Sequence, residues 1–202
     1  MKNIVLTGFM GTGKTAVGKE LSRRLGMKLR DVDTEIEISR KMSIAEIFEK
    51  FGEQRFREIE TEMINNFSRD RNAIIATGGG AVLKQENMDM LKAHGIVVYL
   101  MASPETILKR TEGNDARPLL QGKDPLGTIK DLLNFRKPYY ENADIVVDTE
   151  DKTPLRIAEE IINKIRNSDR NLMALPGDDL STYPYISSNT PMLHCSGTPN
   201  VF

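Results

Sequence analysis

The chain has 202 residues, a length that suits one domain with a proper core and leaves room for an appendage. Its formal net charge of −1 gives no electrostatic argument for a nucleic-acid partner or an anionic membrane, and no apolar run approaches the length of a membrane span. The single cysteine, Cys195, excludes an intrachain disulfide framework and a multi-cysteine metal site, so we expect a soluble cytoplasmic protein.

The first feature along the chain is a phosphate-binding pattern, GFMGTGKT, at residues 8–15. Before it, residues 3–7 form a β-branched run that predicts a buried strand and leaves no room for a signal peptide. After it, apolar residues recur every four positions from Val17 to Leu25, which predicts a helix. A glycine-rich turn between strand and helix aims backbone N–H groups at one point, where Lys14 could reach terminal phosphates and Thr15 could bind Mg²⁺. The alternative is an ordinary turn that happens to contain these residues.

A second short strand is predicted at residues 28–33, after the helix stop at Gly26. Residues two apart in a strand point to the same side, so Asp31 and Asp33 are expected to project together. Two like carboxylates repel, and a shared cation or a substrate hydroxyl would explain the pair. The alternative is a solvated, acidic helix start.

Residues 43–51 predict a short helix that Gly52 interrupts, and a longer amphipathic helix follows. Its apolar face comprises Phe56, Ile59, Met63, Ile64 and Phe67. Arg57 lies beside this face, four residues after Glu53 and three before Glu60. These three residues form either a surface ion-pair ladder or a site in which the two carboxylates hold the Arg57 guanidinium so that it can bind an anionic substrate. The pattern alone slightly favours the ladder.

The next predicted strand, residues 73–77, runs into Gly78, Gly79 and Gly80. Three glycines at the carboxyl end of a strand let a ligand approach the backbone closely, although a plain flexible turn is the alternative. The strand lacks the aspartate that many phosphate-loop enzymes place there beside Mg²⁺. Asp31 is therefore the candidate carboxylate for the metal.

A fourth strand is predicted at residues 96–100, followed by a helix with Ser103 at its cap and Pro104 at its first position. Residues 112–124 form a polar loop with hinge residues and a central Arg117. This loop has the composition of a lid that closes over phosphates, and a mobile surface loop explains it equally well.

The remaining elements are a helix from Pro125 that carries Arg136, a fifth strand within residues 143–148, and a last helix capped by Thr153 and Pro154. The apolar face of this last helix is predicted to be Leu155, Ala158, Ile161, Ile162 and Ile165. Alternating strands and helices indicate a mainly parallel sheet covered on both faces, in one domain of residues 1–168. Residues 169–202 are rich in Pro, Ser, Thr, Asn and Gly and predict an irregular or disordered tail.

Several of these motifs together resemble the shikimate kinase family. The resemblance is carried by the phosphate loop, Asp31-Val32-Asp33, the stretch GEQRFREIE at residues 52–60, the triple glycine, RPLL at residues 117–120, and Arg136. It covers residues 1 to about 167; the family usually has Ser or Thr where this chain has Val32. The resemblance implies a three-layer α/β/α fold with a five-stranded parallel sheet and a mobile lid. It also implies phosphoryl transfer from ATP to the 3-hydroxyl of shikimate, on the route to chorismate and the aromatic amino acids. We expect the protein to be a monomer.

The same resemblance implies roles for individual residues. ATP binding is implied for Gly11, Thr12, Gly13, Lys14, Thr15, Ala16, Arg110, Arg117 and Pro154. Shikimate binding is implied for Asp33, Arg57, Gly78, Gly79, Gly80 and Arg136, with Glu60 holding Arg57. One Mg²⁺ ion, bound with ATP, would lie beside Thr15 and Asp31. Lys14, Asp33 and Arg117 would be catalytic.

Two other functions are compatible with these motifs. One is a kinase of the same fold that acts on another small hydroxylated acid, such as gluconate. The other is a nucleotide-dependent switch without transfer activity, although the chain has no N-K-x-D motif for reading guanine.

Overall fold

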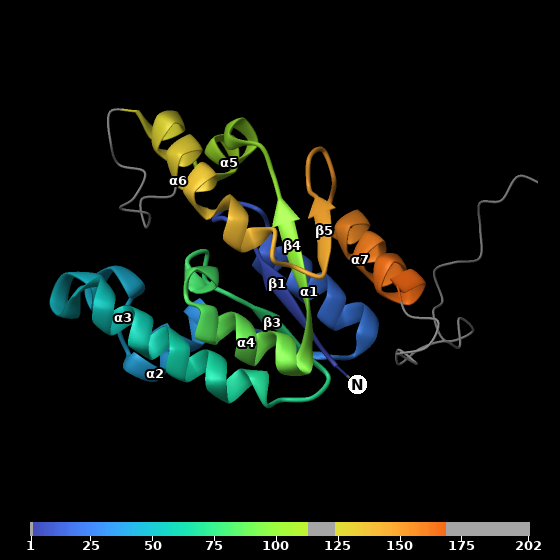
Figure 1. Cartoon of the computed structure of the whole chain (residues 1–202), viewed down its shortest axis with the longest axis horizontal. Helices are drawn as coiled ribbons and strands as arrows, with labels where there is room; N and C mark the ends of the chain where they lie inside the picture. The colour runs from blue at the N-terminus through green and yellow to red at the C-terminus, as the bar shows by residue number, and fades with distance from the viewer. Residues whose placement is uncertain (1, 113–123, 169–202) are drawn as a thin grey trace, which may run out of the picture.

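The computed structural model describes residues 2–112 and 124–168, which form one parallel sheet with helices on both faces (Figure 1). The strands are β1 (Asn3–Thr7), β2 (Lys28–Asp31), β3 (Ala73–Ala76), β4 (Gly95–Met101) and β5 (Ile145–Asp148). The helices are α1 (Lys14–Leu25), α2 (Val32–Arg40), α3 (Ile44–Ser68), the 3-10 turn η1 (Ala81–Leu83), α4 (Gln85–His94), α5 (Pro104–Thr111), α6 (Pro125–Tyr140) and α7 (Pro154–Ser168). The five strands lie in the order β2-β3-β1-β4-β5 and all pairs are parallel, which confirms the predicted fold class. The predicted lid and tail fall mostly or wholly outside the described residues.

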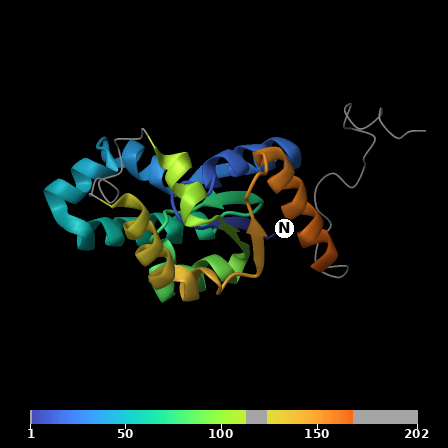
Figure 2. The same cartoon turned by 90° about the horizontal axis from the view of Figure 1, so that it is seen from above.

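The alternation of side chains along the central strands divides the core into two layers. Ile4 and Leu6 of β1 pack with α1 and α7 on one face of the sheet. Val5 of β1 and Val97 of β4 pack with α2 to α6 on the other face. Figures 1 and 2 show α1 and α7 next to each other on one side and α3, α4 and α6 on the opposite side. All of these strand residues are buried because helices cover both faces of the sheet.

The topology brings several loops to one edge of the sheet. β3 lies between β2 and β1, and the three strands run in the same direction, so their carboxyl ends are neighbours. After β3 the chain continues on the far side of β1, at β4. Ligands of open α/β sheets bind at the carboxyl edge beside such a switch in strand order. The phosphate loop follows β1, Asp31 ends β2 and the triple glycine follows β3, so all three lie at this edge.

The second predicted strand is shorter than the sequence pattern suggested. It ends at Asp31, and Asp33 lies in the first turn of α2 instead of in a strand. The cause is the Asp31 side chain, which accepts a hydrogen bond from the Thr34 backbone N–H at 3.2 Å and so caps the helix. The prediction that Asp31 and Asp33 project together because of strand alternation is therefore wrong in its geometry.

Two further details of the helices differ from the predictions. No helix is predicted between the triple glycine and Gly95, where the structure has α4. In α7, Leu155 is 40% exposed and Ile157 takes its predicted place in the core. The remaining predicted positions of α7, from Ala158 to Ile165, are buried as expected.

The start of α3 and its interruption follow directly from sequence. Ser43 accepts from the Glu46 N–H at 3.2 Å, and the Glu46 carboxylate accepts from the Ser43 N–H at 2.7 Å, which completes a capping box. Gly52 has φ 78° and ψ 170°, so the helical path breaks at the predicted residue. The segment that carries Arg57 and Glu60 begins after this break and can take its own direction.

Asn3 joins the start of the sheet to the end of α3. Its buried amide donates to the carbonyls of Ser68 at 3.3 Å and Asp70 at 2.7 Å, and its oxygen accepts from the Ala73 N–H at 3.0 Å. An Asn3→Ala variant should lose roughly 2–4 kcal/mol of unfolding free energy, because three backbone groups lose their partner. Chemical denaturation measures this loss. Asn66→Ala, an exposed change within α3, is the control, and an equal effect of the two variants would contradict the role given to Asn3.

No helix in the described ranges has both the length and the apolar character that a membrane crossing requires.

Candidate functional site

The loop after β1 forms an anion-binding cradle at the start of α1. Gly13 occupies the N-cap with φ 91°, and no side chain caps the first-turn N–H groups. Lys14 Nζ donates to the carbonyls of Gly8 at 2.8 Å and Phe9 at 2.9 Å, so the lysine arches over the loop. Thr12 Oγ1 also donates to the Phe9 carbonyl, at 2.8 Å. Uncapped N–H groups, the positive end of α1 and an adjacent ammonium are suited to phosphate oxygens. Ala16 lies in the same first turn.

Thr15 and Asp31 lie next to each other beside this cradle. Thr15 Oγ1 donates to Asp31 Oδ2 at 2.7 Å across the gap between α1 and β2. Both oxygens are hard ligands of the kind that Mg²⁺ prefers, and Mg²⁺ at nucleotide sites needs only one or two protein groups besides phosphates and water. No cluster of three or more His, Cys, Asp or Glu suited to a metal occurs within the described residues. The pair therefore fits an ion that arrives with a nucleotide better than a stand-alone metal site.

Asp33 reaches the edge of the sheet from the first turn of α2. Its Oδ1 atom is buried and has no hydrogen-bond partner among the described residues. Burial raises the pKa of the Asp33 carboxyl; the Lys14 and Arg57 charges oppose this rise, and Asp31 adds to it. A buried acceptor without a partner requires an explanation, and a ligand hydroxyl is one that fits.

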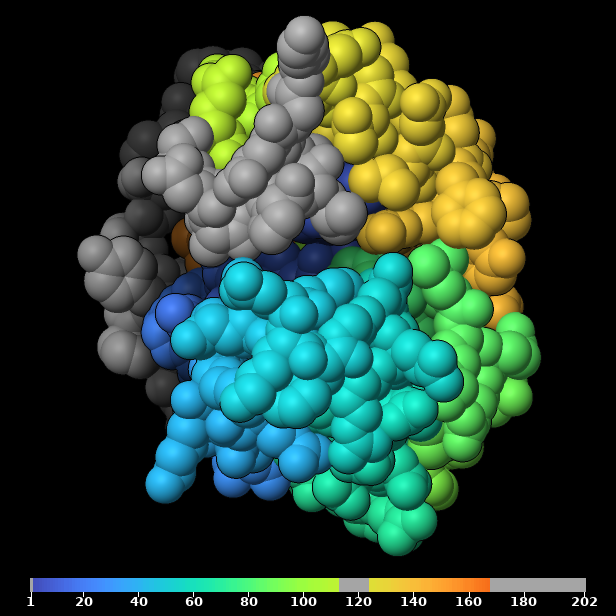
Figure 3. Space-filling view, turned by 90° about the vertical axis from the view of Figure 1, so that its left-hand side faces the viewer, coloured from blue at the N-terminus to red at the C-terminus, as the bar shows by residue number. Residues whose placement is uncertain are grey.

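Asp33 forms part of a cavity of about 360 Å³ beside the phosphate cradle. Figure 3 shows the surface hollowed between α3, in cyan, and α6, in yellow to orange. The cavity is lined by Met10, Asp33, Glu37, Ser43, Ile44, Ala45, Phe48, Phe56, Arg57, Glu60, Gly78, Gly79, Gly80 and Arg136. Its volume is that of a small-molecule site.

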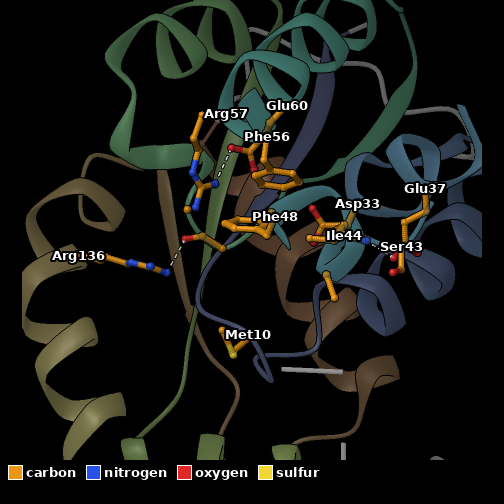
Figure 4. Close-up of a pocket in the computed structure, with 14 residues that line it drawn as sticks. Met10, Asp33, Glu37, Ser43, Ile44, Phe48, Phe56, Arg57, Glu60 and Arg136 are labelled. Carbon is orange, nitrogen blue, oxygen red and sulfur yellow. Dashed lines mark hydrogen bonds and ion pairs between the residues drawn. The ribbon is translucent and has the colours of Figure 1, made fainter. Parts of the chain in front are cut away.

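Arg57 projects from α3 into this cavity, where Figure 4 shows it beside Glu60, and a second carboxylate, Glu53, also holds it. Its Nη1 lies 2.7 Å from Glu60 Oε2, and its Nη2 lies 3.2 Å from Glu53 Oε1. Glu60 is completely buried, so the interpretation of these residues as a surface ion-pair ladder does not describe it. Burial raises the pKa of the Glu60 carboxyl, and the Arg57 charge opposes that rise. Arg57 itself keeps about a quarter of its side chain exposed (27%), so its guanidinium remains accessible to a ligand.

The triple glycine after β3 provides a close approach for three charged side chains. A Cβ atom on Gly78 would lie too close to Glu60 Oε1 and 2.9 Å from Asp33 Oδ1. A Cβ atom on Gly80 would lie 2.5 Å from Arg57 Nη2. Gly78 and Gly80 therefore do more than make a flexible turn, because a side chain at either position would push against the cavity's charged groups.

Arg136 reaches the same cavity from α6. Only 7% of this arginine is exposed, and its Nη1 lies 3.4 Å from the Gly79 carbonyl. Its guanidinium carbon lies 5.5 Å from the centre of the Phe9 ring. Figure 4 shows Arg57 and Arg136 pointing toward the cavity from different elements. Two guanidinium groups at one small cavity suit a carboxylate ligand.

The predicted adenine-side residues lie apart from this cavity. Arg110, near the end of α5, donates to the Thr149 hydroxyl at 3.0 Å and to the Thr149 carbonyl at 2.7 Å. Pro154 opens α7 a few residues after Thr149. The structure thus brings Arg110 close to the loop that leads to Pro154. Arg117 and the predicted lid at residues 112–124 lie outside the described residues, apart from the two ends of that range.

The apolar part of the cavity is not predicted from the sequence. Phe48 and Phe56, whose ring centroids are 4.6 Å apart, line it together with Ile44 and Met10. The spacing of Phe56 predicts a core position, and nothing in that spacing distinguishes a core position from a cavity wall. These side chains make the cavity amphipathic, with cations and carboxylates on one part and hydrocarbon on another.

Comparisons with known proteins agree with one another. The family model described as "Shikimate kinase" matches residues 10–166. A shikimate kinase of Thermodesulfovibrio yellowstonii is 52% identical over 164 residues, 81% of this chain and 95% of that protein. One from Caldicellulosiruptor bescii is 47% identical over 163 residues, 81% of this chain and 95% of that protein. The solved structure described as "Shikimate kinase from Acinetobacter baumannii in complex with shikimate" superposes with a TM-score of 0.82 at 39% identity, covering 84% of this chain and 96% of that one.

Proposed function

The chain belongs to the shikimate kinase family, and we propose that it transfers the γ-phosphoryl group of ATP to the 3-hydroxyl of shikimate. The observation that carries this proposal is the cavity in which Arg57, Arg136 and the orphaned Asp33 oxygen meet beside the phosphate cradle. A small hydroxylated carboxylic acid needs cations for its carboxylate, an acceptor for its hydroxyls and an apolar surface for its ring. The described residues offer all three.

In the proposed complex, the loop 8–15 and the first turn of α1 hold the phosphates of ATP. Lys14 would exchange its present contacts with the Gly8 and Phe9 carbonyls for phosphate oxygens. Arg110 and the segment at Pro154 would lie along the adenine, and Arg117 would approach the transferring group from the lid. Phosphoryl transfer needs alignment and charge neutralisation more than covalent participation, which suits a site built from these cations.

Thr15 and Asp31 are proposed to hold one Mg²⁺ ion bound with ATP. The ion would supply positive charge beside the phosphate oxygens. The 2.7 Å contact between Thr15 and Asp31 already places two suitable oxygens at the cradle. Asp31 also caps α2, so its carboxylate is fixed before the nucleotide arrives.

Arg57 and Arg136 are proposed to hold the shikimate carboxylate, one from α3 and one from α6. Glu60 fixes the Arg57 guanidinium through its 2.7 Å contact and leaves other N–H groups of the fork for the ligand. The ring would then pack against the apolar wall formed by Phe48 and Phe56. Fixing the ring in this way can place one hydroxyl in line with the γ-phosphorus.

Asp33 is proposed to accept the proton of the reacting hydroxyl, or to orient that hydroxyl. Its raised pKa makes it a better proton acceptor than an ordinary aspartate. In a loose transition state the hydroxyl proton can leave late, so a strong base is not required. The unpaired Oδ1 atom is available for this hydrogen bond.

A coupled assay of ADP release tests the proposed activity. ADP release should depend on shikimate and should be far lower with gluconate or other hydroxy acids at the same concentration. Selective turnover of another acid would reassign the substrate, and nucleotide binding without any acceptor-dependent turnover would indicate a switch.

The close approach at Gly80 gives a prediction about the acceptor cavity. A Gly80→Ala variant should displace the Arg57 guanidinium, since the added Cβ would lie 2.5 to 2.7 Å from its atoms. We expect the dissociation constant of shikimate to rise by about tenfold or more, the size of a lost charge-assisted hydrogen bond. Gly79→Ala is the comparison, because a Cβ there would meet atoms no closer than 3.5 Å. Calorimetric titration measures both dissociation constants, and a larger loss of shikimate affinity in Gly79→Ala would contradict the steric argument.

The expected monomeric state and cytoplasmic location of the protein stay predictions.

A further inference from the structure

The peptide that joins Gly79 to Gly80 lies between the two arginines of the cavity. The Gly79 carbonyl accepts from Arg136 Nη1 at 3.4 Å. The Gly80 α-carbon faces Arg57, whose guanidinium would be 2.5 Å from a Cβ atom placed there. The position of this one peptide therefore helps to set how the two cations are spaced.

A shorter hydrogen bond holds the same carbonyl from α6. Tyr140 Oη donates to the Gly79 carbonyl at 2.5 Å, nearly 1 Å shorter than the Arg136 contact. Tyr140 is four residues after Arg136, so both side chains come from the same face of α6. The hydroxyl is well suited to a permanent donor role, because burial raises the pKa of Tyr140 to about 12. The positive charge of Arg136 and its side-chain contact with the tyrosine oppose this rise.

Packing fixes the ring that carries this hydroxyl. Tyr140 is 1% exposed and stacks on Tyr99 of β4, with the ring centroids 4.9 Å apart and the planes 7° from parallel. Pro138 lies in the same turn and supplies no backbone N–H, so the end of α6 depends more on side-chain packing. Tyr140 is therefore held by the sheet, and it in turn holds the glycine turn.

The planarity of the peptide bond carries this constraint further. A trans peptide directs its N–H opposite to its C=O, so a Gly79 carbonyl fixed against α6 also fixes the direction of the Gly80 N–H. Without the tyrosine hydroxyl, the donor that remains to this carbonyl among the described side chains is Arg136. The guanidinium would then be drawn toward the carbonyl and away from a ligand.

We propose that Tyr140 is a positioning residue that sets the two-arginine site by holding the Gly79 carbonyl, and so strengthens binding of the acceptor's carboxylate. This inference rests on the proposed function for the identity of the acceptor. Tyr140 does not line the cavity and would not touch the substrate. It acts through Gly79, Gly80 and Arg136.

The test compares Tyr140→Phe with Tyr99→Phe in the full chain. Each variant loses one hydroxyl from the same stacked pair and keeps both rings, so both should fold, which thermal unfolding checks. Titrations with shikimate and with ATP should show about a five- to tenfold weaker affinity for shikimate in Tyr140→Phe. Its affinity for ATP, and both affinities of Tyr99→Phe, should stay within about twofold of wild type.

The outcomes separate this inference from the proposed function. Unchanged shikimate affinity in Tyr140→Phe, or equal losses for shikimate and ATP, would overturn the positioning role while the wild type still turned over shikimate. An equal loss of shikimate affinity in Tyr99→Phe would also overturn it, since within the described residues it is the Tyr140 hydroxyl that donates to the glycine turn. A wild-type protein that neither binds nor phosphorylates shikimate would instead overturn the proposed function.

Discussion

An Asp33→Asn variant is expected to lose about 10²- to 10⁴-fold in kcat, the usual contribution of a positioned acid or base. Asparagine has the same shape but cannot take up the proton of the reacting hydroxyl. Steady-state kinetics with shikimate measures this loss. Asp131→Asn, an exposed change on α6, is the control and should keep wild-type turnover. Comparable activity of Asp33→Asn and wild type would contradict the role given to Asp33.

The same variant should be more stable than wild type at pH 7, by roughly 0.5–2 kcal/mol. Burial makes the charged form of Asp33 unfavourable in the folded protein and raises the pKa of its carboxyl. Because the pKa of Asp33 is raised in the folded state, its contribution to the free energy of unfolding is fully present below the ordinary aspartate pKa of about 3.9. That contribution is lost as the pH rises through the pKa of the folded state. The advantage of asparagine should thus be small near pH 4 and grow toward pH 7. Denaturation at both pH values measures it, and a variant less stable than wild type at pH 7 would show that Asp33 is favourably ionised.

An Arg57→Ala variant is expected to weaken shikimate binding by roughly 30-fold or more, the lower end for truncating one partner of a buried charge pair. ATP binding should change by no more than about twofold, because Arg57 lines the acceptor cavity and not the phosphate loop. The substitution also leaves the buried Glu60 without its 2.7 Å partner, so some loss of stability is expected as well. Titration of both ligands into folded protein separates the two effects.

Arg55→Ala is the matched control for this variant. Arg55 lies two residues away in the same helix, with 48% of its side chain exposed, and pairs at 2.7 Å with the exposed Glu58. Exposed ion pairs of this kind contribute little to stability, so Arg55→Ala should bind shikimate and ATP as the wild type does. Equal losses of shikimate and ATP affinity in Arg57→Ala would contradict the proposal that this arginine binds the acceptor's carboxylate.

Most of the elements could be predicted in order because each of them has a local signal in the sequence. The helix start at Ser43, the break at Gly52, and the helix start at Ser103 and Pro104 are predicted and the structure reproduces them. The boundary at Asp31 was wrong because a cap depends on where one carboxylate turns, which strand alternation cannot show. α4 was missed because its ten residues bury only Asn87, Met88 and Leu91, too few for a clear apolar face.

Local patterns single out the charged residues that line the cavity, but only the family resemblance implies that these residues share one site. Asp33 and Arg57 are conspicuous in sequence, yet their place around one cavity follows from the sheet order β2-β3-β1, which no local pattern encodes. Tyr140 looks like an ordinary core residue, because its contact with Gly79 joins positions 61 residues apart. Phe48 and Phe56 likewise became cavity residues only through the path of α3.

The most direct test of the proposed phosphoryl transfer is the identity of the product. Wild-type protein incubated with ATP, Mg²⁺ and ¹³C-labelled shikimate should yield one monophosphate, with phosphorus coupling in the NMR spectrum that places the phosphate on the 3-hydroxyl. Release of inorganic phosphate with unmodified shikimate, or a phosphate on another hydroxyl, would contradict the account of how this cavity holds its acceptor.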